Sequence, residues 1–388
     1  MARQNTLRLV IAGGGTGGHV HPALAVIEEF KKRAVALDLL WIGSDGDVEG
    51  PAAQRAGIPF RAIATGKLRR YVSLRTIPDA FRVPVGIAQA WRILQQYQPD
   101  VIFSTGGFVS VPTVLAGARI APILTHEQTA LLGLATRINL RAADVLAVSF
   151  AQSARLAKGF RGQVLVTGNP VRQSLLHGDA ERGLARFGFT SSLPLLYVTG
   201  GARGASPINQ RVASTLSDLL SRCQILHQVG PVSANQDYER LQALRDALPS
   251  ELQPRYRVVD VVREELADVY AAAALVLGRA GAGTVAELAL LGKPSLLIPL
   301  PQSGGGEQQA NAAVLANAGA AIVVDQTEAT PERLVREILS LLSDANRLAA
   351  MGTAARGLAQ PEAAAKLADA LLELAQQRAT TRERGSVR

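Results

Sequence analysis

The segment LRLVIAGGGTGGHVHPALAVIEEF, residues 7–30, decides the fold of this chain. Its apolar run Leu7–Ala12 is typical of a strand that is buried on both faces. Glycines dominate the next six positions, and the following Pro22–Arg33 has the composition of a helix. A strand, a glycine turn and a helix in this order predict one unit of a parallel α/β sheet.

The same unit recurs along the chain. The pattern restarts after a polar stretch at about residues 168–190, so we predict two α/β domains of similar size. Apolar runs predict further strands at residues 37–42, 100–104, 120–125, 145–149 and 163–167, and then at 195–199, 224–228, 257–261, 275–277, 295–299 and 321–324.

Composition narrows the class of protein. The 388 residues include 41 Lys and Arg against 32 Asp and Glu, which leaves a formal charge of +9 and indicates an anionic partner. A hydrophobic content of 48% excludes a disordered chain. The single cysteine, Cys223, excludes an intrachain disulfide and fits a reducing compartment. We expect no signal peptide or membrane span, and a frayed basic tail from Arg378.

Residues Gly13–Gly18 match the dinucleotide-binding pattern G-x-G-x-x-G before a predicted helix. That interpretation requires an acidic residue at the end of the second strand, whereas this strand ends at Gly43-Ser44, with Asp45 and Asp47 in the next loop. A glycine loop at a helix N-terminus still forms an anion site, because its N–H groups and the helix dipole point outward. Five glycines in six positions exceed the needs of a turn, so we expect a ligand at this loop.

His19 follows this loop at the carboxyl end of the first strand, where α/β sheets bind their ligands. Most histidines cap helices or fill cores. Beside an anion loop, however, a side chain with an ordinary pKa of about 6.5 suits general-base work. His21 is a competing candidate, and His126 lies at another predicted strand end, in HEQ.

The second half of the chain has two comparable loops. GGARGA, residues 200–205, links a predicted strand to a helix, and RAGAGTVAE, residues 279–287, leads into a helix that contains Glu287. A carboxylate can accept hydrogen bonds from both hydroxyls of a ribose. Taken alone, Glu287 is more simply interpreted as a first-turn glutamate that the helix dipole favours.

Nine segments taken together resemble one family of bacterial glycosyltransferases, glycosyltransferase family 28. The members it resembles add N-acetylglucosamine to the undecaprenyl-diphosphate muramoyl-pentapeptide carrier of peptidoglycan synthesis. The segments occur in the family's order and span nearly the whole chain. They are GGGTGGHVHPALA (13–25), GKLRR (66–70), STGGFVSVP (104–112), HEQ (126–128), TGNPVR (167–172), GGARGA (200–205), RAGAGTVAEL (279–288), GKPSLLIPLP (292–301) and EQQANA (307–312).

The resemblance implies two Rossmann-like domains facing across a cleft, the GT-B arrangement. We expect an N-terminal acceptor and membrane-associated domain at residues 1–170, a UDP-sugar-binding domain at 171–365, and a helix end with a basic tail at 366–388. The implied donor is UDP-N-acetylglucosamine, and no metal or other cofactor is implied.

The resemblance also implies roles for individual residues. His19 is the expected base for the muramoyl 4-hydroxyl, which gives inversion from α to β, and Glu127 is the alternative base. Glu287 is expected on the ribose, the backbone near Val262 on the uracil, and Gln308 on the sugar hydroxyls. The full expected donor-binding set is Thr16, Gly17, Gly18, Thr129, Arg172, Ala202, Arg203, Val262, Ala282, Gly283, Thr284, Val285, Ala286, Glu287 and Gln308.

The chain departs from the family pattern at several of these positions. Ala202 lacks the usual serine hydroxyl for a phosphate, whereas Arg203 adds a charge for the same anion. Thr129 cannot present an amide donor and acceptor together. The departures are Thr129 and Thr136 for Asn, Ala202 for Ser, Arg203 for Gln, Glu307 for His and Phe108 for Tyr.

Basic and apolar residues interleave between residues 67 and 92. One interpretation is an amphipathic helix that packs on its own sheet. A lipid-linked acceptor favours the other, a surface that binds anionic lipid, with each basic group contributing about 1 kcal/mol. The expected contacts are Leu68, Arg69, Arg70, Ile77, Phe81 and Arg82, which would place the protein peripherally at the cytoplasmic face of the cell membrane.

Three other enzyme classes stay open. They are another lipid glycosyltransferase of the same fold, for example with a diacylglycerol acceptor, a UDP-sugar 2-epimerase, and an NAD-dependent enzyme. The missing strand-end acid weakens the last of these. Nucleic-acid binding explains the charge but not the glycine loops, so no nucleic acid is expected as a partner.

Overall fold

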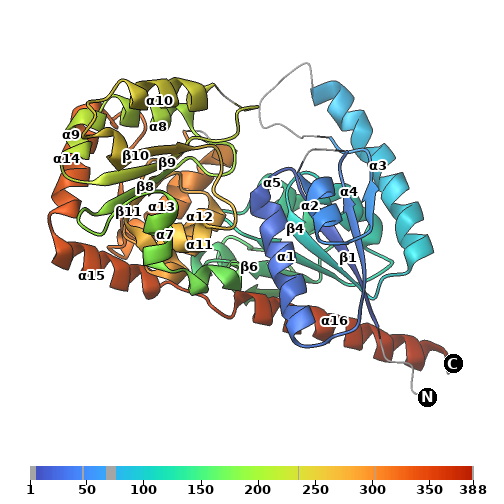
Figure 1. The fold of residues 1–388 in the computed structure, drawn as a ribbon. Coiled ribbons are helices and arrows are strands. Elements are labelled where there is room, and N and C mark those ends of the chain that lie inside the picture. Colours follow the sequence, from blue (N-terminus) through green and yellow to red (C-terminus); the bar gives the residue numbers. More distant parts are fainter. Residues whose placement is uncertain (1–5, 46–47, 67–75, 235, 302, 387–388) are drawn as a thin grey trace. The chain divides into compact units, whose positions relative to one another are not determined.

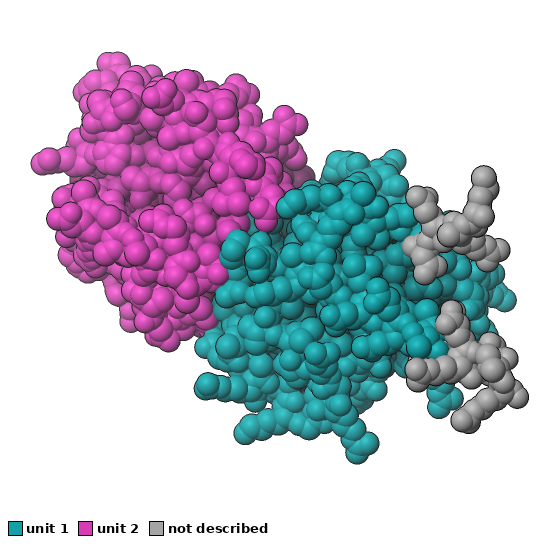
Figure 2. All heavy atoms as spheres, turned by 90° about the horizontal axis from the view of Figure 1, so that it is seen from below, with its two compact units in different colours: residues 1–171, 360–388 teal, residues 172–359 magenta. Residues whose placement is uncertain are grey.

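The structure is a computed structural model that describes residues 6–45, 48–66, 76–234, 236–301 and 303–386. The chain forms two compact units (Figure 2). Unit 1 comprises residues 1–171 and 360–388, and unit 2 comprises residues 172–359.

Unit 1 contains a parallel sheet, seven-stranded in the described residues (Figure 1). Its strands are β1 (Leu7–Gly13), β2 (Leu37–Gly43), β3 (Phe60–Ala62), β4 (Val101–Gly106), β5 (Ile123–Glu127), β6 (Val145–Val148) and β7 (Gln163–Val166). The spatial order is β3-β2-β1-β4-β5-β6-β7, so the direction of winding reverses between β1 and β4.

Helices cover both faces of this sheet. Leu9 and Ile11 of β1 belong to a cluster with α1 and α16, whereas Val10 and Ala12 belong to a second cluster with α3 and α4. This alternation explains why β1 is an uninterrupted apolar run. The helices of unit 1 are α1 (Gly17–Lys32), α2 (Glu49–Arg55), α3 (Thr76–Tyr97), α4 (Ser110–Gly117), α5 (Leu134–Asn139), α6 (Ala151–Ala154) and α16 (Ala363–Ser386).

The last helix, α16, returns to unit 1. Leu367, Leu371 and Leu374 are buried in the cluster that contains residues of α1, and Arg33, the C-cap of α1, pairs with Asp369. Unit 2 therefore ends at residue 359 rather than at 365, because α16 has an apolar face to bury on unit 1. The expected frayed tail is helical through Ser386.

Unit 2 repeats the architecture with a parallel sheet of order β10-β9-β8-β11-β12-β13 in the described residues. The strands are β8 (Leu195–Thr199), β9 (Gln224–Gln228), β10 (Tyr256–Val259), β11 (Ala273–Gly278), β12 (Ser295–Leu297) and β13 (Ala321–Val323). The α-helices are α7 (Ala180–Arg186), α8 (Ser206–Ala213), α9 (Leu216–Leu220), α10 (Asp237–Asp246), α11 (Leu266–Ala272), α12 (Ala282–Leu291), α13 (Glu307–Asn317), α14 (Pro331–Leu342) and α15 (Ala345–Arg356). The 3₁₀ turns in the described part of this unit are η1 (Gln173–His177), η2 (Gln253–Arg255) and η3 (Ser303–Gly305).

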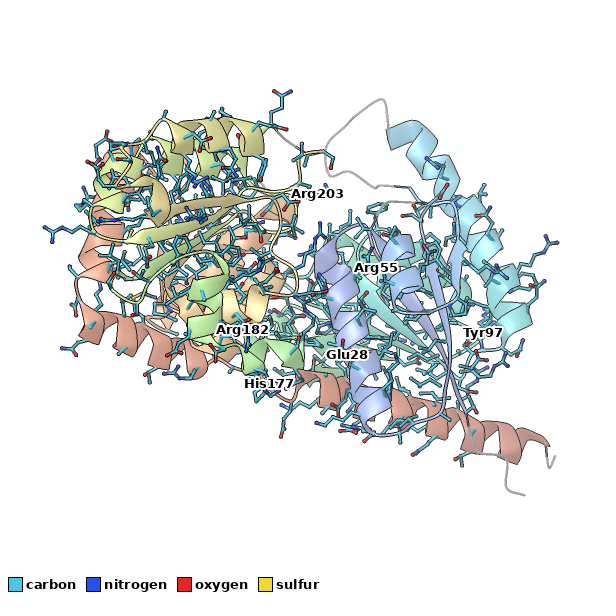
Figure 3. All side chains as sticks on the ribbon, in the orientation of Figure 1. Glu28, Arg55, Tyr97, His177, Arg182 and Arg203 are labelled. Atoms are coloured by element: carbon cyan, nitrogen blue, oxygen red, sulfur yellow. The ribbon has the colours of Figure 1, made fainter. Side chains whose placement is uncertain are left out.

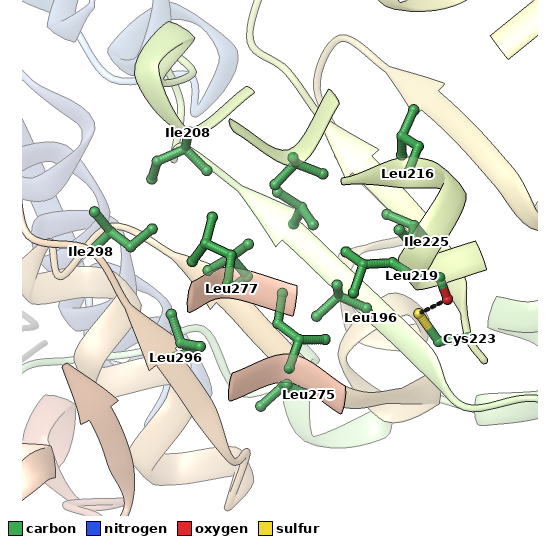
Figure 4. Close-up of a cluster of buried hydrophobic side chains, with 14 of the residues drawn as sticks. Leu196, Ile208, Leu216, Leu219, Cys223, Ile225, Leu275, Leu277, Leu296 and Ile298 are labelled. Carbon is green, nitrogen blue, oxygen red and sulfur yellow. Dashed lines mark hydrogen bonds between the residues drawn. The ribbon is translucent and has the colours of Figure 1, made fainter. Parts of the chain in front are cut away.

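The lone cysteine belongs to the core of unit 2 (Figure 4). Cys223 is buried, its Sγ lies 3.2 Å from the Leu219 carbonyl oxygen, and burial raises the pKa of the thiol to about 12. At neutral pH it is an inert thiol that fills space.

The predicted fold class, two Rossmann-like α/β domains, is confirmed. The predicted strands at 195–199 and 224–228 match β8 and β9, and the other predicted strands overlap observed ones within a few residues. The edge strand β3 was not predicted, because its three residues have no continuous apolar run and two of them, Arg61 and Ala62, are exposed.

Candidate functional site

Both sheets have a topological switch point at the strand that begins the unit. It lies between β1 and β4 in unit 1 and between β8 and β11 in unit 2. At a switch point, the loops that leave the carboxyl ends of the two adjacent strands run to opposite faces of the sheet. Open α/β sheets bind ligands in the space between these two loops. Each unit therefore has a candidate site of its own.

His19 lies in the first turn of α1, beside the unit 1 switch point. Its Nδ1 lies 2.8 Å from the carbonyl oxygen of Thr105 in β4 and 3.1 Å from Oε1 of Gln128. A carbonyl oxygen only accepts hydrogen bonds, so Nδ1 carries a proton, and in the neutral form of the ring Nε2 is the unprotonated nitrogen. This tautomer is the one that a general base acting at Nε2 requires.

Gln128 is itself held in one orientation. Its Nε2 donates to the Thr105 carbonyl at 2.7 Å and lies 3.2 Å from Nδ1 of His126. His126 is completely buried, and burial lowers its pKa to about 4, so its ring is neutral. The His126 Nε2–H donates to the Gly168 carbonyl at 3.0 Å, which leaves Nδ1 as the acceptor. One directional chain of hydrogen bonds thus fixes the ring of His19 through Gln128.

Glu127, the expected alternative base, has a different environment. It is 4% exposed, and its Oε1 accepts from the backbone N–H of Thr129 at 3.1 Å and from the Thr129 hydroxyl at 2.8 Å. Its Oε2 accepts from the N–H of Gly133 at 2.9 Å and from the hydroxyl of Thr136 at 2.6 Å. The carboxylate orders the loop after β5, and both threonines that replace the family's asparagines bind to it.

The expected anion loop of unit 1 holds a side chain that sequence reasoning missed. Glu49, in the first turn of α2, accepts the N–H of Gly15 at 2.9 Å, so this amide already has an anionic partner. Thr16 is the exposed N-cap of α1, and Gly17 and Gly18 begin the helix. The only sequence signal for Glu49 is an acidic residue shortly after the second strand.

In unit 2, the loop 200–205 turns tightly beside the end of β9. A Cβ on Gly204 would lie 2.0 Å from the carbonyl oxygen of Val229, so only glycine fits there, with φ +72°. Ala202 and Arg203 are exposed, and Figure 3 shows Arg203 on this loop. The loop therefore presents a guanidinium group at its tip, whereas Ala202 offers only its backbone and methyl group.

Gln228 connects this loop to Val262. Its Oε1 accepts from the Tyr197 hydroxyl and from the Val262 N–H, each at 3.0 Å. Its Nε2 donates to the Gly201 carbonyl at 3.1 Å and to the Thr199 hydroxyl at 3.2 Å. The buried carboxamide thus uses both donors and both acceptor positions and fixes two predicted ligand-binding segments relative to each other.

Glu287 lies in the second turn of α12 and is approached by two groups. The Tyr270 hydroxyl donates to its Oε2 at 2.8 Å, and the Tyr270 ring packs edge-on against Tyr197 at a centroid distance of 5.7 Å. Burial raises the pKa of Glu287, whereas the Tyr270 hydrogen bond and the positive charge of Arg172 oppose this rise. Burial and the nearby Glu287 also raise the pKa of Tyr270 well above its usual value.

The N-terminus of α12 contains the remaining predicted residues of that segment. Gly281 is the N-cap, and the first-turn N–H groups point out of the helix, where the dipole favours an anion. Val285 is buried and accordingly packs in the core, whereas Ala282, Gly283, Thr284 and Ala286 are half-buried.

Gln308 lies in the first turn of α13. Its Oε1 accepts from the Leu300 N–H at 2.9 Å, and its own N–H donates to Ser303 Oγ at 3.2 Å. No partner of its Nε2 occurs among the described residues, so this amide group is available to a ligand.

Arg279 is a buried residue to which its sequence motif, RAGAGTVAE, assigned no role of its own. Its guanidinium donates to the carbonyls of Ile298 and Pro299 at 2.9 and 3.0 Å, and to Gln326 Oε1 at 2.6 Å. Burial lowers its pKa to about 10. It braces the ends of β11 and β12 beside the candidate site.

The predicted membrane residues are only partly described. Leu68, Arg69 and Arg70 lie outside the described residues, as do the side chains of Ile77 and Phe81 in α3. Arg82 is exposed on α3. In the part of the chain that the structure describes, no helix is long and apolar enough to cross a bilayer.

Comparisons with known proteins cover both units. Residues 9–148 match the glycosyltransferase family 28 N-terminal domain, and residues 195–378 match the glycosyltransferase family 28 C-terminal domain. A protein of Halalkalibacterium halodurans is 37% identical over 93% of this chain and 98% of its own length. It is named UDP-N-acetylglucosamine–N-acetylmuramyl-(pentapeptide) pyrophosphoryl-undecaprenol N-acetylglucosamine transferase.

Two solved structures are also similar. The crystal structure of Acinetobacter baumannii MurG has a TM-score of 0.71 and 28% identity, and covers 95% of this chain and 99% of that one. The UDP-GlcNAc 2-epimerase of Neisseria meningitidis, bound to UDP-GlcNAc, has a TM-score of 0.66 over 95% of this chain and the whole of that one. Its 13% identity shows the shared fold alone.

The Glu287–Tyr270 contact generates a prediction. Tyr270→Phe removes a hydrogen bond that favours the ionised carboxylate, so it should raise the pKa of Glu287 further. Titration of the full chain with carboxyl-¹³C glutamate measures this value. Tyr238→Phe, on α10, removes a hydroxyl elsewhere in unit 2 and should leave the Glu287 titration unchanged. An unchanged or lower pKa in Tyr270→Phe would contradict the assignment.

Proposed function

The chain belongs to glycosyltransferase family 28, and we propose that it moves N-acetylglucosamine from UDP-N-acetylglucosamine to the 4-hydroxyl of undecaprenyl-diphosphate muramoyl-pentapeptide. The observation that carries the proposal is the fixed tautomer of His19, a base at the switch point of a family domain. The names of the relatives supply the two substrates.

Unit 2 is the donor-binding unit in this proposal. Glu287 accepts hydrogen bonds from the ribose hydroxyls while Tyr270 holds its other oxygen. Arg172, Arg203 and the N-terminus of α12 attract the diphosphate. The carbonyl of Val262 can accept from uracil without disturbing Gln228, whereas use of the Val262 N–H requires its bond to Gln228 to break.

Unit 1 supplies the base. As the 4-hydroxyl oxygen bonds to the anomeric carbon, its proton passes to Nε2 of His19 and the bond from that carbon to the UDP oxygen breaks. Attack from the face opposite to UDP converts the α linkage to β. The resulting imidazolium is stabilised by the two carbonyl oxygens that face its Nδ1–H, those of Thr105 and Gln128.

Negative charge grows on the departing UDP. Cationic arginines and helix-terminal N–H groups can stabilise this charge without a metal ion. Metal-independent transfer is therefore part of the proposal.

His19 is preferred to Glu127 as the base for a geometric reason. Hydrogen bonds from the loop after β5 and from Thr136 of α5 hold both oxygens of the Glu127 carboxylate, so a substrate hydroxyl would have to displace one of them. Thr129 and Thr136 each place a hydroxyl on that carboxylate, so in this chain the pair supports the loop rather than a sugar.

A membrane-facing surface on α3 fits a lipid-linked acceptor. Val85 and Trp91 are 52% and 53% exposed, and Arg82 and Arg92 are exposed on the same helix. Exposed apolar side chains beside basic ones bind anionic membrane surfaces. We place this surface on the cytoplasmic leaflet, where the soluble donor is available.

The transfer reaction is the direct test. Full-length protein with radiolabelled UDP-N-acetylglucosamine and lipid-linked muramoyl-pentapeptide should give labelled lipid product, with or without EDTA. His19→Ala should lower kcat by roughly 10²–10⁴-fold and keep UDP affinity, whereas His21→Ala should keep both. Transfer only to diacylglycerol, or epimerised donor without transfer, would refute the reaction. Full turnover by His19→Ala would remove it from the base role.

The role of Gln128 gives a separate prediction. Gln128→Met removes one of the acceptors that stabilise the imidazolium, so kcat should fall about tenfold and the acid limb of the pH–kcat profile should move to lower pH. The KM for UDP-N-acetylglucosamine should not change, because Gln128 is not among the expected donor-binding residues. A uniform loss of activity at every pH would indicate a purely structural role.

Membrane binding is tested by sedimentation with lipid vesicles. Wild-type protein should sediment with vesicles that contain an anionic lipid and not with neutral ones, and salt should weaken this binding. Replacing Arg82 and Arg92 by Gln together should reduce binding roughly tenfold or more. Arg55→Gln, an exposed arginine on α2 (Figure 3), is the matched control. Equal binding to neutral vesicles would contradict the charge-based proposal.

A further inference from the structure

Glu49 is a buried carboxylate inside the first glycine loop. Glu49 is only 1% exposed, although it is the first residue of a short helix, α2. Oε2 accepts from the N–H of Gly15 at 2.9 Å, and Oε1 accepts from both the N–H of Ser44, at 3.0 Å, and the Ser44 hydroxyl. Three donors from two loops therefore converge on one anion.

The negative charge of the Glu49 carboxylate is compensated by dipoles rather than by a cation. Among the described residues, no basic side chain forms an ion pair with Glu49. Its partners are N–H and O–H groups, and it lies at the loop that enters α1, a helix of 16 residues whose N-terminus favours negative charge. This is the environment in which related loops hold a phosphate.

At two glycines, a larger residue would collide with the Glu49 side chain. A Cβ on Gly14 would lie 2.3 Å from Cδ of Glu49, and a Cβ on Gly43 would lie 2.7 Å from its Cγ. The surplus of glycines, which from sequence indicates a ligand loop, is therefore required in part by a side chain of the protein. The space next to the Gly15 amide is already filled.

We propose that Glu49 is a built-in anion that occupies the phosphate position of the first glycine loop. The Gly15 amide consequently does not bind a phosphate group, and the fixed course of the loop sets the start of α1 and the position of His19. This inference goes beyond the proposed function and does not depend on which sugar is transferred.

The test is a gain of anion binding. Calorimetric titration of the full chain with pyrophosphate, in the presence of saturating UDP, gives the number of remaining anion sites. Glu49→Ala removes the internal anion and should gain one site per chain relative to wild type. Glu28→Ala removes an equal charge from the exposed face of α1 (Figure 3) and should gain none. A folded Glu49→Ala protein with the stoichiometry of wild type would overturn the proposal.

A measurement on the wild type keeps the proposal testable if Glu49→Ala does not fold. In a spectrum of the ¹⁵N-glycine-labelled chain, the Gly15 signal is identified by its absence in Gly15→Asn, since Asn tolerates the observed φ of +80°. Pyrophosphate should leave this signal unmoved while UDP saturates unit 2. A shift of the Gly15 signal that saturates with pyrophosphate would show that phosphate reaches the loop, and would refute the inference.

Discussion

The close approach of two backbones at each switch point is the constraint on which the sites depend. In unit 1, a Cβ on Gly13 would lie 2.1 Å from the Thr105 hydroxyl, and one on Gly107 would lie 2.8 Å from the Gly14 carbonyl. These contacts bring the end of β4 against the start of α1. Because the two segments touch, the Thr105 carbonyl reaches the ring of His19 and fixes its tautomer.

The two units use the same topology for different electrostatic purposes. Unit 1 places the Glu49 side chain on the amide of Gly15, next to the start of α1, and has His19 as its reactive group. Unit 2 presents the exposed Arg203 in the loop that enters α8, the helix that corresponds to α1. A phosphate group therefore meets a cationic side chain in unit 2, whereas the Gly15 amide of unit 1 is already bound by Glu49.

Neutral carboxamides do much of the positioning in both units. Gln128 and Gln228 are buried at strand ends, and each joins a loop to the neighbouring strand through donors and acceptors on one side chain. A carboxamide can do this without the desolvation penalty of an ion.

The sequence by itself determined the two α/β units, most strand positions and the glycine loops, because continuous apolar runs and glycine turns are local patterns. It also identified His19 and Glu287 through motifs that resemble a family. Only the tertiary structure decided which groups these residues meet: Gln128 and Thr105 around His19, Tyr270 and Arg172 around Glu287, and Glu49 inside the first loop. Those partners come from other helices, strands and loops, 17 to 115 positions away along the chain. The roles of Glu127 and Thr129 depend likewise on a folded loop, because a hydrogen bond between them is a matter of geometry that residue types alone do not determine.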